Sequence, residues 1–556
     1  MDTLPKDSGN DLSSFSGSYP STTGQPKTPP PPASPTAATN QPAPFITEPV
    51  SQTPTIGDAN NPFAQAAVPA PVESVAPSPV PTATTQTSPP SVVPEPPSSP
   101  QPPPNTGTPF VMQAQAPSPM SPKGGGGLIK RILGILLLFI IIGGVGFVAF
   151  RFISGFIAQN QPITLTYWGL WEDDTIMAPI VAEYKKTHPK VEVVYTKQSP
   201  RQYRERLQAA ITRGEGPDLF RFHASWVPML KNELAPAGST GYTAQEFQQT
   251  FYPVAYSDLV VGGKVLGVPL MIDGLGLYYN EDLLRAAGVA PPSSWESFRE
   301  AALALTVKDN KGKIVTSGAA LGTASNVEHF SDIVALMMLQ NGADLKNPVT
   351  KETTDALSFY RLFAESPGNV WDETLDNSIL AFASGKVAMI FAPSWQAHEI
   401  KQVNPELKFQ VLSVPQLPGS SVAWASYWAE GVAATSKHPQ ESWEFLKFLS
   451  SKESLLSLYT EASKTRLFGE PYSRVDLAQT LINDPYVGAY IKQAPTAKSF
   501  FLSSRTFDNG INDRMIKYVE DGINSLGKGV SMDAVLDTVA KGFAQVLTNF
   551  GASSAR

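Results

Sequence analysis

Apolar positions along residues 161–550 follow two periods, and the two periods alternate. Residues 163–167 alternate apolar with β-branched polar side chains, as a strand with one buried face does, and apolar residues then recur at helical spacing from Ile176 to Tyr184. A second strand, a second helix and a third strand follow at 191–195, 203–211 and 217–220. Strands that alternate with helices predict an α/β fold with a mostly parallel sheet and right-handed crossovers.

The ends of these strands are where a ligand site is expected. Ligands bind beyond the carboxyl ends of parallel strands, which places residues 168–172 and 221–226 at the mouth of a candidate site. Residues 268–279 form a mostly apolar run that is typical of a buried strand, yet Asp273 sits near its middle beside Gly274. Burying a charge without a partner is costly. The partner of Asp273 therefore lies either inside the protein or on a ligand.

The longest apolar run predicts a membrane span. Residues 132–150 provide 19 positions without a charge, close to the roughly 20 that cross a bilayer as a helix. The run begins too deep in the chain and is too long for a cleaved signal peptide, and its basic flanks argue against a buried core helix. Because three basic residues precede the run and only Arg151 follows closely, we expect a single-pass helix at 128–152, with the preceding residues cytoplasmic and the following ones outside the cell membrane.

Composition separates the residues before this run from those after it. Residues 1–127 hold 31 of the 52 prolines, and segments such as 29–32 and 102–104 can neither donate main-chain hydrogen bonds nor build a core. We predict a disordered, partly polyproline tail that serves as a spacer. A docking tail for partners that read proline is the alternative.

Charge and missing motifs exclude several functions. A mild net charge of −7, spread along the chain, provides no electrostatic footprint for nucleic acid. Zero cysteines exclude disulfides, thiolate metal sites and a lipidated cysteine anchor. The chain has no P-loop, zinc-protease or nucleophile-elbow motif, and its five histidines lack metal-ligand spacing. We therefore expect no enzyme activity, no cofactor and no metal.

Three segments carry a family resemblance in a fixed order. They are GKVLGVPLMIDGLGLYYNEDLLRAAGVAPPSSWESF at 263–298, AFASGKVAMIFAPSWQAHEI at 381–400 and EGVAATSKHPQESWEFLKFLSSKE at 430–453. The first has Gly-Val-Pro, a short strand, Tyr-Asn and an acidic-leucine helix. The second has a Gly-Lys turn before an Ala-Met strand and a tryptophan, and the third has a strand before an amphipathic helix. Together they resemble the extracellular solute-binding proteins that supply sugars to ABC importers, the maltose-binding-like family.

The resemblance covers about 161–550 and implies a two-lobed, periplasmic-binding-protein-like fold of the class II type, with a hinge and a ligand between the lobes. It would assign about 161–271 and 424–470 to the first lobe and about 274–420 and 475–550 to the second. The position that matches Asp273 is an acid that hydrogen-bonds sugar hydroxyls in maltose-binding-like members. A hinge carboxylate capped by main-chain amides is the alternative for Asp273.

Candidate ligand-binding residues follow from the chemistry of carbohydrates, which present apolar C–H faces and rims of hydroxyls. Proteins hold them with aromatic platforms, carboxylates, amides and guanidinium groups. The strand ends and the family positions supply Asp273, Trp395, Trp171, Glu172, Trp168, Trp226, Arg221, Ser225, Trp424, Tyr427 and Trp428. Ser225 and Trp226 stand where maltose-binding proteins place an acid and an arginine. This departure makes maltodextrin specificity doubtful, while a neutral sugar remains favoured.

These features together predict a membrane-anchored extracytoplasmic substrate-binding protein of an ABC importer. We expect a monomer that closes around a mono- or oligosaccharide and presents it to the transmembrane subunits of the permease. Two alternatives remain, because function resides in the site rather than in the fold. One is a surface receptor or sensor that captures a solute without transport, and the other is a carbohydrate-processing enzyme on the same scaffold.

Overall fold

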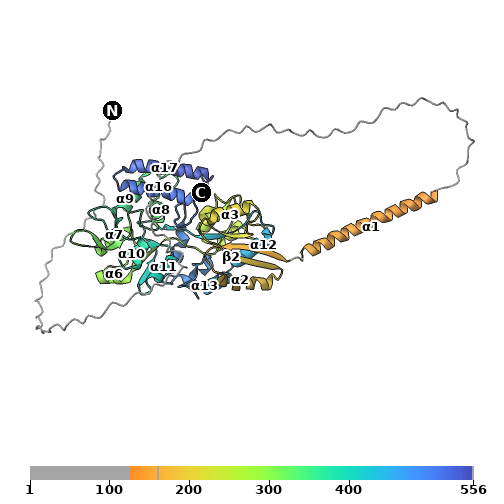
Figure 1. The fold of residues 1–556 in the computed structure, drawn as a ribbon, viewed down its shortest axis with the longest axis horizontal. Helices are drawn as coiled ribbons and strands as arrows, with labels where there is room; N and C mark the ends of the chain where they lie inside the picture. The colour runs from red at the N-terminus through yellow and green to blue at the C-terminus, as the bar shows by residue number, and fades with distance from the viewer. Residues whose placement is uncertain (1–125, 160–161, 554–556) are drawn as a thin grey trace, which may run out of the picture. The chain divides into compact units, whose positions relative to one another are not determined.

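The structure is a computed structural model that describes residues 126–159 and 162–553 (Figure 1). The tail predicted for 1–127 falls almost wholly outside the described residues. The first helix, α1 (Gly126–Gln159), contains the apolar run predicted to span a membrane. Its side chains are described from Arg131 to Phe147, and all of these are exposed. Counting only residues that the structure describes, no helix offers an apolar stretch long enough to cross a membrane.

The first sheet has the strand order β2-β1-β3-β13-β6. β1, β2 and β3 are parallel, whereas β13 runs antiparallel to both β3 and β6. The alternation read from the sequence is visible in β1, which buries Leu165 and Tyr167 and exposes Thr164 and Thr166. The five strands are β1 (Ile163–Gly169), β2 (Val191–Lys197), β3 (Leu219–His223), β6 (Val268–Pro269) and β13 (Trp428–Val432).

Helices pack around this sheet and form with it what we call the first lobe (Figure 1). α2 (Asp174–Thr187) turns Ile176, Met177, Ile180 and Tyr184 inward, at the spacing that predicted a helix. A short hairpin joins β4 (Val260–Val261) to β5 (Lys264–Val265). The remaining helices of this lobe are α3 (Tyr203–Thr212), α4 (Ala244–Thr250), α5 (Pro253–Leu259), α12 (Pro439–Leu449) and α13 (Lys452–Ala462).

The second sheet, in the order β11-β7-β10-β9-β8, is the centre of the second lobe. Only β9 and β10 are parallel, and the other pairings in this sheet are antiparallel. The prediction of mostly parallel strands is therefore correct for β1 to β3 and wrong here, because β7 enters from the first lobe and runs opposite to β10. The strands are β7 (Gly276–Asn280), β8 (Val307–Lys308), β9 (Ile314–Ala319), β10 (Val387–Ala392) and β11 (Phe409–Leu412).

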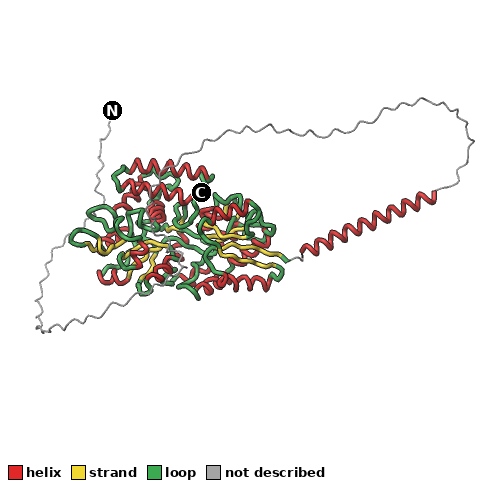
Figure 2. The backbone as a smooth tube through the Cα atoms, viewed as in Figure 1, coloured by secondary structure: helices red, strands yellow, loops and turns green. Residues whose placement is uncertain are grey.

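The second lobe is richer in helices than the first (Figure 2). Its helices are α6 (Glu281–Ala287), α7 (Trp295–Leu305), α8 (Phe330–Gln340), α9 (Lys351–Leu362), α10 (Ser378–Ala383), α11 (Gln396–Val403), α14 (Ala478–Leu481), α15 (Gly488–Gln493), α16 (Ile511–Leu526) and α17 (Met532–Asn549). A separate parallel pair joins β12 (Ala423–Trp424) to β14 (Ala497–Lys498). The lobe limits predicted from the sequence stay a prediction.

Three segments pass between the two sheets, near residues 270–275, 424–427 and 470–474. We call them the hinge segments. Gly274 bridges to Ala425, and the Ser426 amide donates to the main-chain oxygen of Asp273 at 2.9 Å. A Cβ at Gly274 would lie 1.8 Å from the main-chain oxygen of Trp424. Only glycine therefore lets the first two hinge segments approach so closely.

The apolar run 268–279 is not the single strand that the sequence predicted. β6 ends at Pro269 and β7 begins at Gly276, and the two strands belong to different sheets. Both are buried in their own sheets, so the run stays apolar through the break between them. The residues between β6 and β7 form the first hinge segment, with Asp273 on it.

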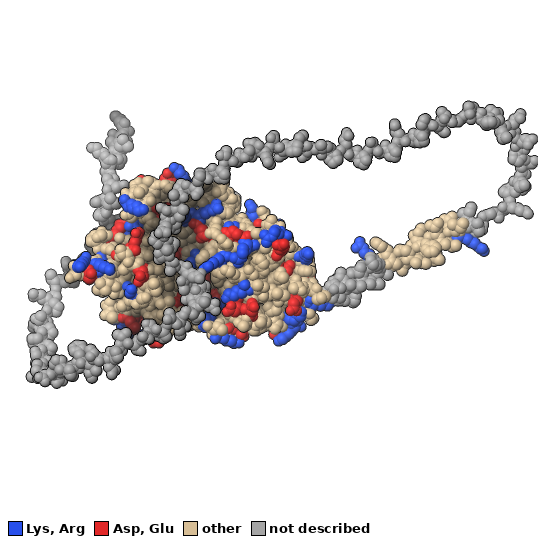
Figure 3. Space-filling view, viewed as in Figure 1, with Lys and Arg blue, Asp and Glu red and all other residues tan. Residues whose placement is uncertain are grey.

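Basic and acidic side chains are interspersed over the globular part on the face seen in Figure 3. This distribution agrees with the mild net charge of the sequence.

Candidate functional site

The carboxylate of Asp273 has its polar partners inside the protein. Ser394, which follows β10 in the second lobe, donates its amide to Oδ1 at 3.0 Å and its hydroxyl to Oδ2 at 2.8 Å, and the Gly274 amide donates to Oδ1 at 2.8 Å. Burial raises the pKa of Asp273 to about 7, although these hydrogen bonds act in the opposite direction. This geometry is that of a hinge carboxylate capped by hydrogen-bond donors of the protein. The sugar-binding role of Asp273 stays a prediction.

Arg221, Glu172 and Glu430 form a buried ion-paired triad. Arg221 Nε lies 2.6 Å from Glu430 Oε1, and Arg221 Nη1 lies 2.5 Å from Glu172 Oε2. Arg221 and Glu430 face each other in the antiparallel register of β3 and β13, which explains why they meet. Burial alone would lower the pKa of Arg221, but the two carboxylates hold it well above its usual range. Glu172 and Arg221, both predicted to bind ligand, thus form an ion pair with each other in this structure.

Four tryptophans among the predicted site residues keep part of their surface exposed. They are Trp168, Trp171, Trp428 and Trp395. Trp171 and Trp428 meet edge to face with ring centroids 5.4 Å apart, and Trp428 meets Trp226 in the same way at 5.2 Å. Trp395 lies in the second lobe, directly before α11, and contacts the His329 ring edge to face at 5.9 Å. Half-exposed indoles of this kind are suited to stacking against the C–H face of a sugar.

The other predicted residues are buried within the fold. Trp424 donates from Nε1 to Asp332 at 2.7 Å, and Tyr427 donates its hydroxyl to Asp258 at 2.9 Å. Trp226 is buried beneath Trp428. In this structure these three side chains serve packing rather than an open surface.

A cavity of about 20 Å³, lined mostly by apolar side chains and by four charged ones, lies against the triad. Glu172 and Arg221 line it on one side, and Arg466 and Glu470, which follow α13, line it on the other. Burial raises the pKa of Glu470, although Arg466, whose Nη1 lies 2.9 Å from Glu470 Oε1, opposes that shift. Sequence reasoning missed Arg466 and Glu470, because no motif surrounds them and their place depends on how the third hinge segment folds back.

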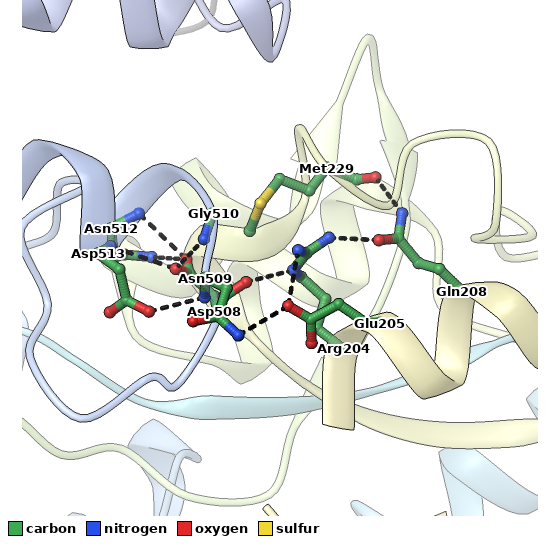
Figure 4. A network of polar contacts seen from close by, with 9 residues as sticks. All are labelled: Arg204, Glu205, Gln208, Met229, Asp508, Asn509, Gly510, Asn512 and Asp513. Carbon is green, nitrogen blue, oxygen red and sulfur yellow. Dashed lines mark hydrogen bonds and ion pairs between the residues drawn. The ribbon is translucent and has the colours of Figure 1, made fainter. Parts of the chain in front are cut away.

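The two lobes are joined by hydrogen bonds that we call the interlobe network (Figure 4). Arg204 of α3 donates from Nε to the main-chain oxygen of Asp508 at 2.6 Å, and Asn509 donates from Nδ2 to Glu205 Oε1 at 3.0 Å. Asn512, at the start of α16, donates from Nδ2 to the hydroxyl of Ser225 at 2.7 Å. The hydroxyl of Ser225, a predicted ligand residue, thus accepts a hydrogen bond from the second lobe.

The segment that supplies this network has an uncommon main-chain conformation. Arg505, Phe507 and Asn509 have positive φ angles of 59°, 52° and 43°. Each such non-glycine residue costs on the order of 1 kcal/mol. Contacts of this segment with both lobes offset that cost, including an ion pair between Arg505 and Glu328.

Comparison with known proteins places the chain in a family. Residues 170–455 match the family model described as bacterial extracellular solute-binding protein. The chain belongs to this family, which confirms the resemblance read from the three segments. Family membership also confirms the prediction of a binding protein rather than an enzyme.

Curated relatives match over part of their length. Binding proteins of Brucella abortus and Brucella suis are 25% identical over 262 residues, which cover 45% of this chain and 62% of each relative. The match thus leaves more than a third of those relatives outside it. The multiple sugar-binding protein of Streptococcus mutans is 24% identical over 324 residues, which cover 54% of this chain and 74% of that protein.

Solved structures share the fold. A cyclo/maltodextrin-binding protein in complex with maltotetraose has a TM-score of 0.57 at 19% identity, covering 70% of this chain and 98% of that one. The sugar-binding protein MalE of Xanthomonas citri has the same TM-score and identity, covering 69% of this chain and 98% of that one. The predicted α/β, periplasmic-binding-protein-like fold class is confirmed.

Proposed function

We propose that this chain is the substrate-binding component of an ABC importer and that it binds a neutral mono- or oligosaccharide between its lobes. The proposal is supported by relatives that are named for binding multiple sugars and for binding melibiose, raffinose and stachyose. Its protein partners would be the transmembrane subunits of the permease, and the chain would act as a monomer.

The observation that carries the proposal is the placement of partly exposed indoles on both lobes. Trp171 follows β1 and Trp428 begins β13 in the first lobe, and Trp395 lies between β10 and α11 in the second. The end of β3 faces the second lobe, as the bond of Ser225 to Asn512 indicates, and the end of β10 faces the first hinge segment, as the bond of Ser394 to Asp273 indicates. A sugar held there would contact aromatic faces from two sides.

Binding from both lobes explains how the ligand would be signalled to a permease. A ligand that contacts both lobes stabilises the arrangement in which they are close, and its differential affinity sets how far the equilibrium shifts. The hinge segments allow such closure while the two sheets stay intact. The importer would then recognise the closed pair of lobes.

We further propose that the chain is held at the membrane by residues 128–152, with the tail cytoplasmic and the solute-binding domain outside. The support is the uncharged run at 132–150, the helical conformation of α1 and the absence of any cysteine for a lipid anchor. This attachment would keep the binding domain close to a permease in the same membrane.

Titration calorimetry tests the binding function. The full-length chain is titrated with maltose, mannobiose, melibiose and raffinose, and with a free amino acid as control. We expect micromolar or tighter binding of at least one saccharide and none of the amino acid. Absence of binding to every saccharide would contradict the proposal. Binding without capture of a permease subunit after crosslinking in membranes would favour the receptor alternative.

A further inference from the structure

The guanidinium of Arg466 has an edge that no group of residues 126–159 or 162–553 satisfies. Its Nη1 pairs with Glu470 Oε1 at 2.9 Å, while Nε and Nη2 are buried without a hydrogen-bond partner. Nε and Nη2 lie on the same edge of the planar group, the fork with which arginine grips oxygen acceptors. Leaving charged donors buried and unpaired is costly, so this edge is expected to meet an oxygen.

The unpaired edge belongs to a residue that lines the cavity next to the triad. Glu172 and Glu470 also line this cavity, whose remaining wall is mostly apolar, and its volume of about 20 Å³ accepts one oxygen-sized group. It therefore offers hydrogen-bond donors and acceptors side by side in a space too small for a whole sugar ring.

The cavity lies close to the hinge and to the second lobe. Met271 and Tyr472, which pair as a β-bridge between hinge segments, form part of its wall. His398 of α11 in the second lobe packs its ring against Phe468 at 4.2 Å, two residues from Arg466. The cavity thus adjoins the hinge segments and lies near a contact between the two lobes.

The guanidinium and carboxylate groups at the cavity determine which kind of ligand group can bind there. A carboxylate or phosphate could accept from Arg466 but could not donate to Glu172 or Glu470, and an ammonium could donate but not accept. Two guanidinium groups, of Arg221 and Arg466, lie at the cavity. They face three carboxylates, those of Glu172 and Glu470 and that of Glu430, which pairs with Arg221. An additional anion is therefore disfavoured. A hydroxyl group both accepts and donates, and it is neutral.

We infer that Arg466 and Glu470 form a subsite that receives one hydroxyl group of the ligand, with Arg466 donating a hydrogen bond to its oxygen and a carboxylate of the wall accepting a hydrogen bond from it. This inference rests on the proposed function and adds to it a ligand class, a neutral polyhydroxyl compound, and a residue that reads it. Arg466 is accordingly a ligand-binding residue outside the set predicted from the sequence.

The test pairs variants of the protein with variants of the sugar. The saccharide that binds most tightly among maltose, mannobiose, melibiose and raffinose is titrated into the full-length wild type, together with its monodeoxy derivatives. One deoxy position is expected to lower affinity by tenfold to a hundredfold in the wild type. Arg466→Met should bind the parent sugar more weakly than the wild type by a similar factor. The variant should bind that one deoxy derivative as well as it binds the parent sugar.

Controls separate recognition from structure. Arg466→Lys keeps the charge but loses the fork, so it should behave like Arg466→Met. Arg213→Met, which removes an exposed arginine paired with Glu215, should bind like the wild type. Arg466→Met also removes the ion pair with Glu470, so thermal melting without sugar should show some loss of stability, and only a loss of affinity confined to one deoxy position reports recognition.

Three outcomes would overturn the inference. Unchanged affinity of Arg466→Met for every sugar would mean that the cavity holds only water. Tighter binding of the corresponding uronic acid than of the neutral sugar would exclude the ligand class. If the wild type binds none of the saccharides, both the proposed function and the subsite are wrong. If the wild type binds a saccharide and Arg466→Met binds it equally well, only the subsite is wrong.

Discussion

Arg204 Nε and the main-chain oxygen of Asp508 lie 2.6 Å apart, which joins α3 of the first lobe to the segment before α16 of the second. Asn509 and Asn512 add two further bonds between the lobes. The lobes therefore have protein contacts of their own that favour their approach. The apparent affinity of a ligand rises with the fraction of protein already in the competent arrangement.

Removing these contacts should open the protein. We expect Arg204→Met combined with Asn509→Ala to increase the radius of gyration of the ligand-free protein and to weaken sugar binding by roughly threefold to tenfold. Small-angle X-ray scattering and titration calorimetry measure the two effects. Arg206→Met is the matched control, because Arg206 is on the same helix but donates to Ser199 within its own lobe. A double variant as compact and as tight-binding as the control would contradict this role.

Asp273 should make stability depend on pH in a defined direction. Its pKa is about 7 in the folded protein against 3.8 without burial, so between these values the folded state holds a proton that the unfolded chain releases. The contribution is fully present below about pH 4 and is lost as pH rises through 7, at roughly 1.4 kcal/mol per pH unit. Asp273→Asn cannot titrate and should show a flatter stability between pH 4 and 7 in urea denaturation.

The same variant tests the ligand role of Asp273. If its carboxylate also binds a sugar hydroxyl, Asp273→Asn should weaken affinity about tenfold to a hundredfold, since hydrogen bonds to charged groups contribute roughly 1.5–3 kcal/mol. Unchanged affinity together with the altered pH dependence would assign Asp273 to the hinge alone. Ser394→Ala, which removes the hydroxyl donor to Oδ2, provides an independent change of the same carboxylate.

The sequence predicted what depends on local periodicity and missed what depends on distant contacts. The strands at 163–167 and 191–195 and the helix at 176–184 are found as β1, β2 and α2, because burial of one face imposes its period on the chain. The partners of Asp273 and Arg221 could not be read in this way. Ser394 lies 121 residues from Asp273, and Glu430 lies 209 residues from Arg221.

Candidate site residues were harder to predict than the fold because the same residue types serve packing and binding. Trp424 and Trp395 are both tryptophans near strand ends, yet the first is buried with its indole N–H bonded to Asp332 and the second is half-exposed. Nothing in the local sequence separates them, since exposure is decided by the neighbouring lobe. Arg466 was not predicted, because its position near the triad depends on tertiary contacts rather than on the local sequence.

The buried triad should respond strongly to loss of its cation. Arg221→Met would leave Glu172 and Glu430 buried and facing each other without compensation, and we expect a loss of roughly 3–5 kcal/mol in the free energy of unfolding. Urea denaturation of the full-length chain measures it. Arg213→Met removes a solvent-exposed pair and should change stability by less than about 1 kcal/mol. If Arg221→Met unfolds like the wild type but binds no sugar, Arg221 faces the ligand instead.

The predicted topology can be tested on intact cells. With the tail cytoplasmic and the solute-binding domain outside, added protease should digest the domain and spare an epitope placed near Lys27, since the basic residues precede the apolar run. Permeabilised cells are the control, in which the epitope should be lost as well. Loss of the epitope from intact cells would reverse the orientation.

Trp395 and Trp424 form a matched pair that separates stacking from packing. Trp395→Ala should weaken sugar binding by about tenfold or more and lower the melting temperature of the ligand-free protein less than Trp424→Ala does, because its indole is partly exposed. Trp424→Ala should instead lower the free energy of unfolding by roughly 3–5 kcal/mol, since it leaves a cavity and deprives Asp332 of its indole donor. Both variants are measured by thermal melting and by titration with the tightest-binding sugar. Equal loss of stability in the two would show that Trp395 is a packing residue, and the second lobe would then lack the aromatic platform on which the proposed sugar site depends.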